Sequence, residues 1–190
     1  PHNVHVVLLP KVEDPDLVKD AADRLRELTG GDPPFLMPII ESPGGVHRAF
    51  EIARVDEAVV ALTLGLEDLS AELGAPRTSE ATESLLARQT TVYAARAATV
   101  QPIASVYSDI GNEEGLAEYA RRETALGFDG IGCIHPRQIP VVHREMTPTG
   151  DEVDRAVRIV RAAREAEARG LGAVAVGSKM VDRPVVKQAF

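Results

Sequence analysis

The sequence has one cysteine, no long apolar run and no cluster of basic residues, and each shortage excludes a class of protein. With Cys133 alone, no disulfide can form within the chain, so a reducing compartment is expected. No apolar run approaches the roughly 20 residues of a membrane span, so we expect no membrane partner. The first nine residues lack the charged start and cleavage site of a signal peptide, which predicts a cytoplasmic protein.

The charge balance is mildly acidic, with 29 Asp and Glu against 21 Lys and Arg. Because the basic residues form no patch or stripe, no nucleic-acid partner is expected. Hydrophobic residues make up 44% of the 190 residues and charged residues 26%, which is typical of a soluble globular domain with a real core.

Five short apolar runs rich in Val, Ile and Leu are spaced along the chain. They cover residues 6–9, 36–40, 59–64, 102–106 and 131–134. The runs do not alternate with polar residues, which is typical of strands buried on both faces of a parallel sheet. Helical patterns lie between them, over residues 16–28, 43–53, 80–98 and 113–126. Strands that alternate with helices indicate βαβ units and an α/β fold.

Local signals mark several helix ends. Ser42 is a predicted N-cap with Pro43 at the first helical position, and Gly127 follows the predicted 113–126 helix. Thr149 and Glu152 form a capping-box pattern that opens a further helix running to about residue 169. No repeat or linker interrupts the chain. We therefore expect one domain over residues 1–190, with strands and helices to about residue 146 and a helical tail over 147–190.

Charged or polar side chains follow the predicted strands. These residues are Lys11 and Glu13, Glu41, Glu67 and Asp68, Asp109, and His135. Because the carboxyl ends of parallel strands meet at the same edge of an α/β fold, where active sites form, we expect the carboxylates to converge there.

From the residues alone, some assignments at this edge stay open. Glu41 and Asp68 are either ligands of a divalent cation or helix caps. Gly44 and Gly45 either present free N–H groups to an anion at a helix N-terminus or simply make a tight turn. Lys11 and Glu13 either pair with each other at the rim or contact a substrate.

Short motifs along the chain carry a resemblance to a known family. They read LPKVE at 9–13, IESP at 40–43, LGLEDL at 64–69, VYS at 106–108, NEEGL at 112–116, GFDG at 127–130, IHPRQIP at 134–140 and KMVDRP at 179–184. In this order and over nearly the whole chain, they resemble the citrate lyase β-subunit branch of the HpcH/HpaI aldolase superfamily.

The resemblance implies a (β/α)8 TIM-type barrel, assembled as a homo-trimer or hexamer. Compared with that fold, the chain holds only the C-terminal five βα units, strands four to eight, and the helical tail, which serves as a subunit-contact segment. The three leading strands, with a substrate-binding arginine, are not in the sequence. Because an open five-stranded sheet exposes apolar edges, we expect further sequence or a partner to complete it.

The resemblance also implies an activity, the Mg²⁺-dependent cleavage of a C–C bond in a 3-hydroxy-acyl thioester to give a 2-oxo acid and an acetyl thioester. The expected substrate is citryl-ACP or citryl-CoA. Citramalyl-CoA or malyl-CoA is the first alternative, and free 2-oxo-4-hydroxy acids are the next. An alternative of another class is a non-catalytic subunit that serves the assembly of a lyase complex with other lyase subunits.

Site residues carry over from the family motifs to this sequence. Glu41 and Asp68 match the two metal carboxylates, and oxygen ligands of this kind suit Mg²⁺. Asp182 matches an aspartate that acts as an acid/base group in a neighbouring subunit's site, although it could instead pair with Arg183 on the surface.

Substrate contacts are expected from Glu41, Gly44, Gly45 and His135. Among these, His135 is a candidate for contact with the pantetheine arm or for ordering the site. The alternative is a hydrogen-bonded histidine at the rim.

Overall fold

The chain forms two compact units, Pro1–Met146 and Thr147–Phe190, which we call the sheet unit and the tail unit. The computed structural model describes residues 4–78, 80–177 and 179–189. That the two units belong to one barrel domain stays a prediction. No helix in the described ranges is long and apolar enough to cross a membrane.

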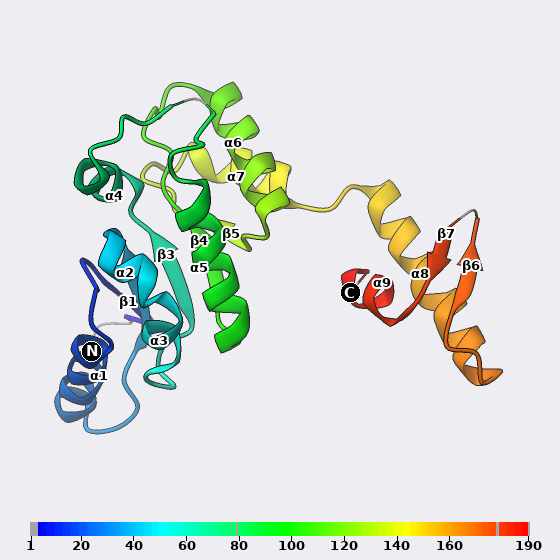
Figure 1. Ribbon diagram of the computed structural model, residues 1–190, viewed down its shortest axis with the longest axis horizontal. Coiled ribbons are helices and arrows are strands. Elements are labelled where there is room, and N and C mark those ends of the chain that lie inside the picture. The colour runs from blue at the N-terminus through cyan, green and yellow to red at the C-terminus, as the bar shows by residue number, and fades with distance from the viewer. Residues whose placement is uncertain (1–3, 79, 178, 190) are drawn as a thin grey trace. The chain divides into compact units, whose positions relative to one another are not determined.

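The sheet unit is built on a five-stranded sheet in which every pair of neighbours is parallel and the order follows the chain (Figure 1). Its strands are β1 (Val6–Leu9), β2 (Phe35–Ile40), β3 (Ala61–Leu64), β4 (Gln101–Ala104) and β5 (Gly130–Ile131). Sequential parallel order with a helix after each strand is the arrangement of a (β/α)8 barrel. The predicted fold class is therefore confirmed, with five βα units in this chain.

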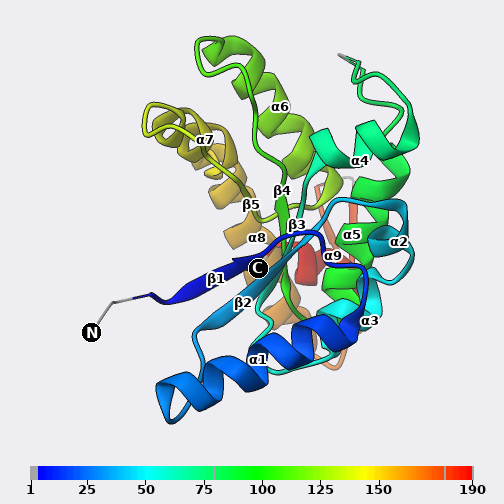
Figure 2. The same ribbon diagram turned by 90° about the vertical axis from the view of Figure 1, so that its left-hand side faces the viewer.

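Seven helices of the described sheet unit connect and cover the strands (Figure 2). They are α1 (Pro15–Thr29), α2 (Pro43–His47), α3 (Ala49–Arg54), α4 (Leu66–Leu73), α5 (Leu85–Ala98), α6 (Glu113–Leu126) and α7 (Gln138–Met146). The helix predicted over 43–53 is two helices, because the backbone at Arg48 leaves helical geometry with φ −106° and ψ 13°. The helix predicted over 80–98 begins only at Leu85. The sequence analysis predicted neither α4 nor α7.

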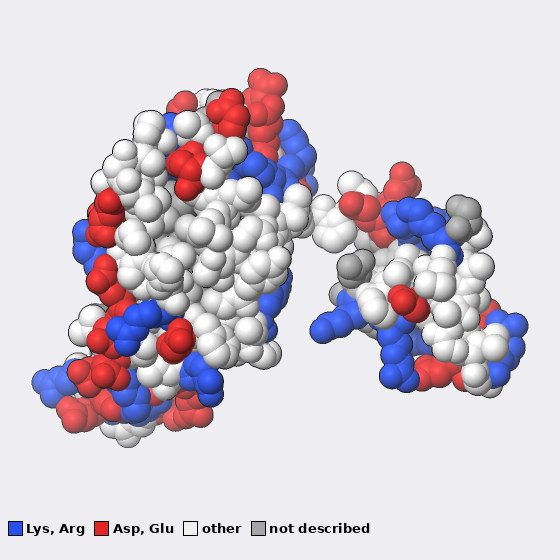
Figure 3. Space-filling view, in the orientation of Figure 1, with Lys and Arg blue, Asp and Glu red and all other residues white. Residues whose placement is uncertain are grey.

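The two faces of the sheet are covered unequally near β1. Val7 and Leu9 pack against the core, whereas Val6, Leu8 and the first residue of β2, Phe35, are exposed. In the described sheet, β1 has β2 as its one neighbour. On the face drawn in Figure 3, charged side chains gather at the margins of the sheet unit and leave an extended uncharged area between them. The expected exposure of apolar residues at an open sheet edge is thus observed.

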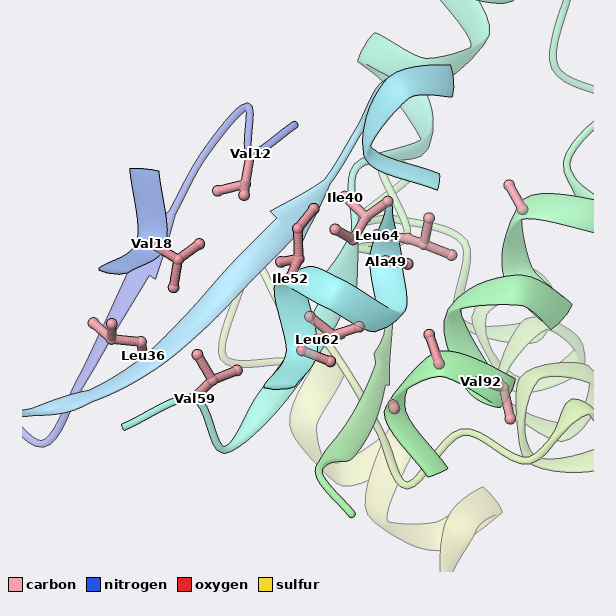
Figure 4. Close-up of a cluster of buried hydrophobic side chains, with 14 of the residues drawn as sticks. Val12, Val18, Leu36, Ile40, Ala49, Ile52, Val59, Leu62, Leu64 and Val92 are labelled. Atoms are coloured by element: carbon pink, nitrogen blue, oxygen red, sulfur yellow. The ribbon is translucent and has the colours of Figure 1, made fainter. Parts of the chain in front are cut away.

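The core lies between the sheet and the helices that follow β1, β2 and β3 (Figure 4). Leu36 and Ile40 of β2, Leu62 of β3 and Ile52 of α3 have no exposed surface. Each such side chain contributes about 1.5–3 kcal/mol by leaving water. This packing fixes the strand ends that carry the polar residues.

The tail unit contains α8 (Gly150–Ala168), an antiparallel hairpin of β6 (Val174–Val176) and β7 (Lys179–Val181), and α9 (Arg183–Gln188). The predicted capping box is present at the start of α8. The Thr149 side chain accepts a hydrogen bond from the Glu152 N–H, and the Glu152 carboxylate accepts one from the Thr149 N–H. The capping box could be predicted from the sequence because it depends only on Thr149 and Glu152, which are three residues apart.

Candidate functional site

Glu41 directly follows β2, and its side chain is buried at the carboxyl end of the sheet. Its Oε1 atom accepts a hydrogen bond of 2.6 Å from the backbone N–H of Lys11, which follows β1. On the other side it lies against Gly65, where an added Cβ atom would overlap Oε2 of Glu41. Only glycine at position 65 leaves room for this carboxylate, which is therefore held by the loops after β1 and β3.

The connection from β3 to α4 is anchored to both neighbouring strands. The N–H of Gly65 donates to the Ile40 carbonyl at 2.9 Å, and the N–H of Leu66 donates to Oγ of Ser105 at 3.4 Å. The second of these bonds reaches the end of β4. Asp68 consequently sits in the first turn of α4, where the positive end of the helix dipole favours a carboxylate.

Lys11 joins the two carboxylates. While its backbone N–H holds Glu41, its Nζ atom lies 3.1 Å from Oδ1 of Asp68. The hydrogen bond to Asp68 and the negative charges of Asp68 and Glu41 raise the pKa of Lys11, so its ammonium stays charged at neutral pH. The sequence left Lys11 either pairing with Glu13 or contacting a substrate. The structure pairs it with Asp68, while the Glu13 carboxylate lies beside Gly44.

The Ser42–Gly45 segment is a tight helix start. Ser42 caps α2 and accepts a hydrogen bond of 3.0 Å from the Gly45 N–H, as its predicted N-cap role requires. An added Cβ at Gly45 would lie 2.6 Å from the carbonyl oxygen of Val12. The tight-turn interpretation is thus directly supported. Anion binding by Gly44 and Gly45 stays a prediction, in which an anion at Gly45 would compete with the Ser42 cap.

His135 takes part in a local network before α7. Its Nδ1 atom accepts from the Arg137 N–H at 3.2 Å, and its own N–H donates to Oε1 of Gln138 at 3.2 Å. Buried Gln138 also donates through Nε2 to the Tyr107 carbonyl at 2.8 Å, which ties the loops after β4 and β5 together. These contacts give His135 an ordered backbone at the same sheet edge. Its contact with a substrate stays a prediction.

Asp182 lies in the tail unit, between β7 and α9. It is the N-cap of α9, and its Oδ1 atom accepts a hydrogen bond of 3.3 Å from the Val185 N–H. The structure therefore gives this side chain a capping role, which the sequence analysis did not consider for it. Whether it also transfers a proton stays a prediction.

The donor set at the sheet edge decides which metals it fits. Within the described ranges, no three His, Cys, Asp or Glu side chains gather as a metal-binding group. The edge instead offers two carboxylates, Glu41 buried and Asp68 half-exposed. Mg²⁺ commonly binds through one or two carboxylates and keeps several waters, whereas a structural Zn²⁺ needs four protein ligands. The residues fit Mg²⁺.

Several residues that shape the site were missed in the sequence. Gly65 carried a usable signal, because a lone glycine after a buried strand often marks a close approach of side chain or backbone. Ser105 and Gln138 carried none, since each acts through a partner brought close only by the fold.

Comparison with known proteins agrees with this geometry. Residues 2–136 match the family model described as HpcH/HpaI aldolase/citrate lyase, which is well over half of the chain. The chain belongs to this family. Its five-stranded sheet, with the carboxylates after β2 and β3, is a part of the family's barrel.

Individual relatives extend the similarity into the tail unit. Citrate lyase subunit beta of Escherichia coli K12 is 42% identical over 189 residues, covering 97% of this chain and 63% of that protein. The mitochondrial citramalyl-CoA lyase of Mus musculus is 32% identical over 195 residues, covering 96% and 58%. The chain thus spans less than two thirds of these relatives' lengths.

A solved structure gives the same picture. CitE from Mycobacterium tuberculosis, in complex with magnesium, acetoacetate and coenzyme A, superposes with a TM-score of 0.77 and 35% identity. The match covers 97% of this chain and 66% of that one.

Proposed function

We propose that this chain belongs to a Mg²⁺-dependent C–C lyase that splits a 3-hydroxy-acyl thioester into a 2-oxo acid and an acetyl thioester. Its substrate is citryl-ACP or citryl-CoA. The observation that carries the proposal is the pairing of Glu41 with Asp68 through Lys11 at the carboxyl ends of adjacent strands. The 42% identity to a citrate lyase β subunit and the magnesium and coenzyme A of the CitE complex support it.

In the proposed reaction the substrate hydroxyl loses a proton and the C–C bond breaks. The electron pair passes to the thioester α-carbon, which then takes up a proton, and the carbinol carbon becomes the ketone of the 2-oxo acid. Glu41 and Asp68 would hold Mg²⁺, which supplies Lewis acidity to the oxygen of that ketone. Glu41, which is buried, would also adjoin the substrate.

The remaining assigned residues have supporting roles in this proposal. Asp182 moves the proton as an acid/base group, and does so in a neighbouring subunit of a homo-trimer or hexamer. Gly44 and Gly45 donate N–H groups to the substrate carboxylate. His135 contacts the pantetheine arm. We further propose one barrel domain over both units, contacts of the tail with other subunits, assembly with other lyase subunits and a cytoplasmic location.

Citramalyl-CoA is the second candidate substrate, with malyl-CoA beside it. The mouse citramalyl-CoA lyase, 32% identical and aligned over 96% of this chain, supports it. All these substrates contain the hydroxyl and carboxylate that a carboxylate-held metal binds, so turnover rates must distinguish them.

The test is cleavage of a substrate panel by the whole protein, with Mg²⁺ and with the metal chelated. The panel contains citryl-CoA, citryl-ACP, citramalyl-CoA, malyl-CoA and a free 2-oxo-4-hydroxy acid. Glu41→Gln and Asp68→Asn should lose about a thousandfold or more in rate, since each removes a charge that holds the metal. Glu67→Gln is the matched control, because Glu67 neighbours Asp68 but pairs with Arg77 at 2.6 Å.

Retained cleavage in Glu41→Gln and Asp68→Asn would overturn the assigned site. If the folded wild type cleaves no member of the panel, the protein is a non-catalytic assembly subunit instead.

Asp182 needs a separate pair of variants, because it also caps α9. Asp182→Asn keeps a good N-cap and removes the acid/base group, whereas Asp182→Ala removes both. Loss of cleavage in both variants, with α9 intact in Asp182→Asn, supports proton transfer. Full activity of Asp182→Asn would leave capping as the residue's role.

A further inference from the structure

Lys11 contacts both carboxylates of the site through two different parts of the residue. Its backbone N–H donates to Oε1 of Glu41 at 2.6 Å, and its Nζ atom is 3.1 Å from Oδ1 of Asp68. A lysine that only formed a surface ion pair would make the contact between Nζ and Asp68 and would not need the backbone contact with Glu41. The two contacts together tie the loop after β1 to Glu41, which follows β2, and to Asp68 in the first turn of α4.

The backbone at Lys11 is specialised for this contact. Its φ angle is 53°, in the left-handed region that residues other than glycine adopt infrequently. The next residue, Val12, is buried and donates its N–H to the Ile39 carbonyl at 3.4 Å. The conformation is therefore fixed by packing, and it turns the Lys11 N–H toward Glu41.

The ammonium group of Lys11, unlike its backbone, lies in solvent. The Lys11 side chain is 73% exposed, so the contact with Asp68 can open without breaking any packing. Its positive charge nevertheless cancels one of the two negative charges offered by Glu41 and Asp68. A cation bound by these carboxylates would experience repulsion from the Lys11 charge, or would have to replace its contact with Asp68.

We infer that Lys11 regulates the metal affinity of the Glu41–Asp68 pair, with its backbone holding Glu41 in position and its ammonium competing with the metal for Asp68. The inference rests on the proposed function, because it takes this pair as the metal site. It makes Lys11 a positioning residue through one atom and a competing cation through another. The two roles predict opposite effects on metal binding.

The experiment titrates the whole protein with Mg²⁺ alone by calorimetry, and with Mn²⁺ by electron paramagnetic resonance. Lys11→Met removes the ammonium and keeps the backbone contact and the aliphatic stem. We expect it to bind Mg²⁺ roughly five- to tenfold more tightly, the effect of removing one nearby positive charge in a solvent-exposed setting. Lys11→Arg keeps the charge and should bind within about twofold of wild type.

Lys19→Met is the matched control, because Lys19 also pairs with carboxylates, those of Asp23 and Asp56, but away from the strand ends that form the site. It should leave the affinity unchanged. If Lys11→Met folds poorly by circular dichroism, Lys11→Gly carries the same expectation, since glycine readily adopts the positive φ.

The outcomes separate this inference from the proposed function. Equal or weaker Mg²⁺ binding by the ammonium-free variants, with wild-type binding that requires Glu41 and Asp68, overturns the inference and leaves the metal site standing. Binding by Lys11→Met but not by wild type supports the inference in its strongest form. Absence of Mg²⁺ binding in both proteins overturns the inference and the metal site together.

Discussion

The sheet unit and the tail unit are stabilised by different kinds of contact. The sheet unit joins residues distant in sequence, as when Lys11, Glu41 and Asp68 meet through three separate loops. The tail unit relies on local signals, which are the capping box that opens α8 and the Asp182 cap of α9. Among the described residues of the tail unit, the buried hydrophobic ones are Ile159, Ala166 and Val181, whereas the sheet unit contains a large continuous core.

The sheet unit can hold a reactive side chain in a fixed position, whereas the local signals of the tail unit only fix where a helix begins. A carboxylate such as Glu41, fixed by a backbone donor and a glycine contact, keeps its geometry because the core keeps it. A unit of about 40 residues with few buried side chains has little stability of its own. We therefore expect equivalent substitutions to cost more in the sheet unit than in the tail unit.

The largest effect is expected at an ion pair inside the sheet unit. Arg88 of α5 and Glu123 of α6 are both almost fully buried, and Nη1 of Arg88 lies 2.5 Å from Oε1 of Glu123. Nη2 of Arg88 also donates to the Ala81 carbonyl at 2.7 Å. Burial raises the pKa of Glu123, and the adjacent guanidinium opposes that rise.

Glu123→Gln should lower the free energy of unfolding by about 3–5 kcal/mol, because it leaves the Arg88 charge buried without its counter-ion. Urea unfolding of the two proteins measures the difference. Replacing both partners, as in Arg88→Met with Glu123→Leu, should recover much of the loss. A loss below about 1 kcal/mol in Glu123→Gln would mean that the interior of the sheet unit tolerates an unpaired charge.

A matched pair of isoleucines compares the two units directly. Ile52 of α3 has 0% exposure in the sheet unit, and Ile159 of α8 has 8% in the tail unit. Ile52→Ala should cost about 2–4 kcal/mol because the surrounding core cannot close the cavity, and Ile159→Ala about 1–2 kcal/mol because the small unit can relax. Urea unfolding with hydrogen exchange resolved by segment reports each cost. Equal costs would contradict the difference drawn between the units.

A smaller effect is expected at a partly buried ion pair of the sheet unit, and it depends on pH. The hydrogen bonds from Arg26 of α1 hold the pKa of Asp56 below its ordinary value, at Nη–Oδ distances of 2.6 and 2.9 Å. A carboxylate with a lowered folded-state pKa stabilises the protein above its unfolded value near 3.9, and this contribution is lost as pH falls through the folded-state pKa.

Arg26→Met should therefore lower the melting temperature by about 2–4 °C at pH 7 and by progressively less below pH 4. Calorimetric melting at pH 7, 5, 4 and 3 tests this. A deficit that stays constant over the whole series would show that Arg26 does not act through the charge of Asp56.

Much of the architecture could be predicted from the sequence because it depends on short-range pattern. The strand at residues 6–9, the helix at 113–126 and the caps at Ser42 and Thr149 were all legible in this way. The division of the 43–53 helix at Arg48 was not, since it depends on how α2 and α3 pack against α5.

The site could be predicted from the sequence only in part. The position of Glu41 and Asp68 after neighbouring parallel strands follows from the order of elements. The role of Lys11 does not, because its positive φ and its reach to Asp68 exist only once Val12 is buried and α4 is in place. Contacts of this kind depend on three loops at once, and no sequence spacing encodes them.

The central claim is that Glu41 and Asp68 form a single metal site. The most direct measurement is a double-mutant cycle of Mg²⁺ affinity with Glu41→Gln, Asp68→Asn and the double variant. If the carboxylates share one ion, each single substitution weakens binding by about 100-fold or more, and the double variant is little worse than either. Additive losses, or Mg²⁺ binding that survives both substitutions, would contradict the account.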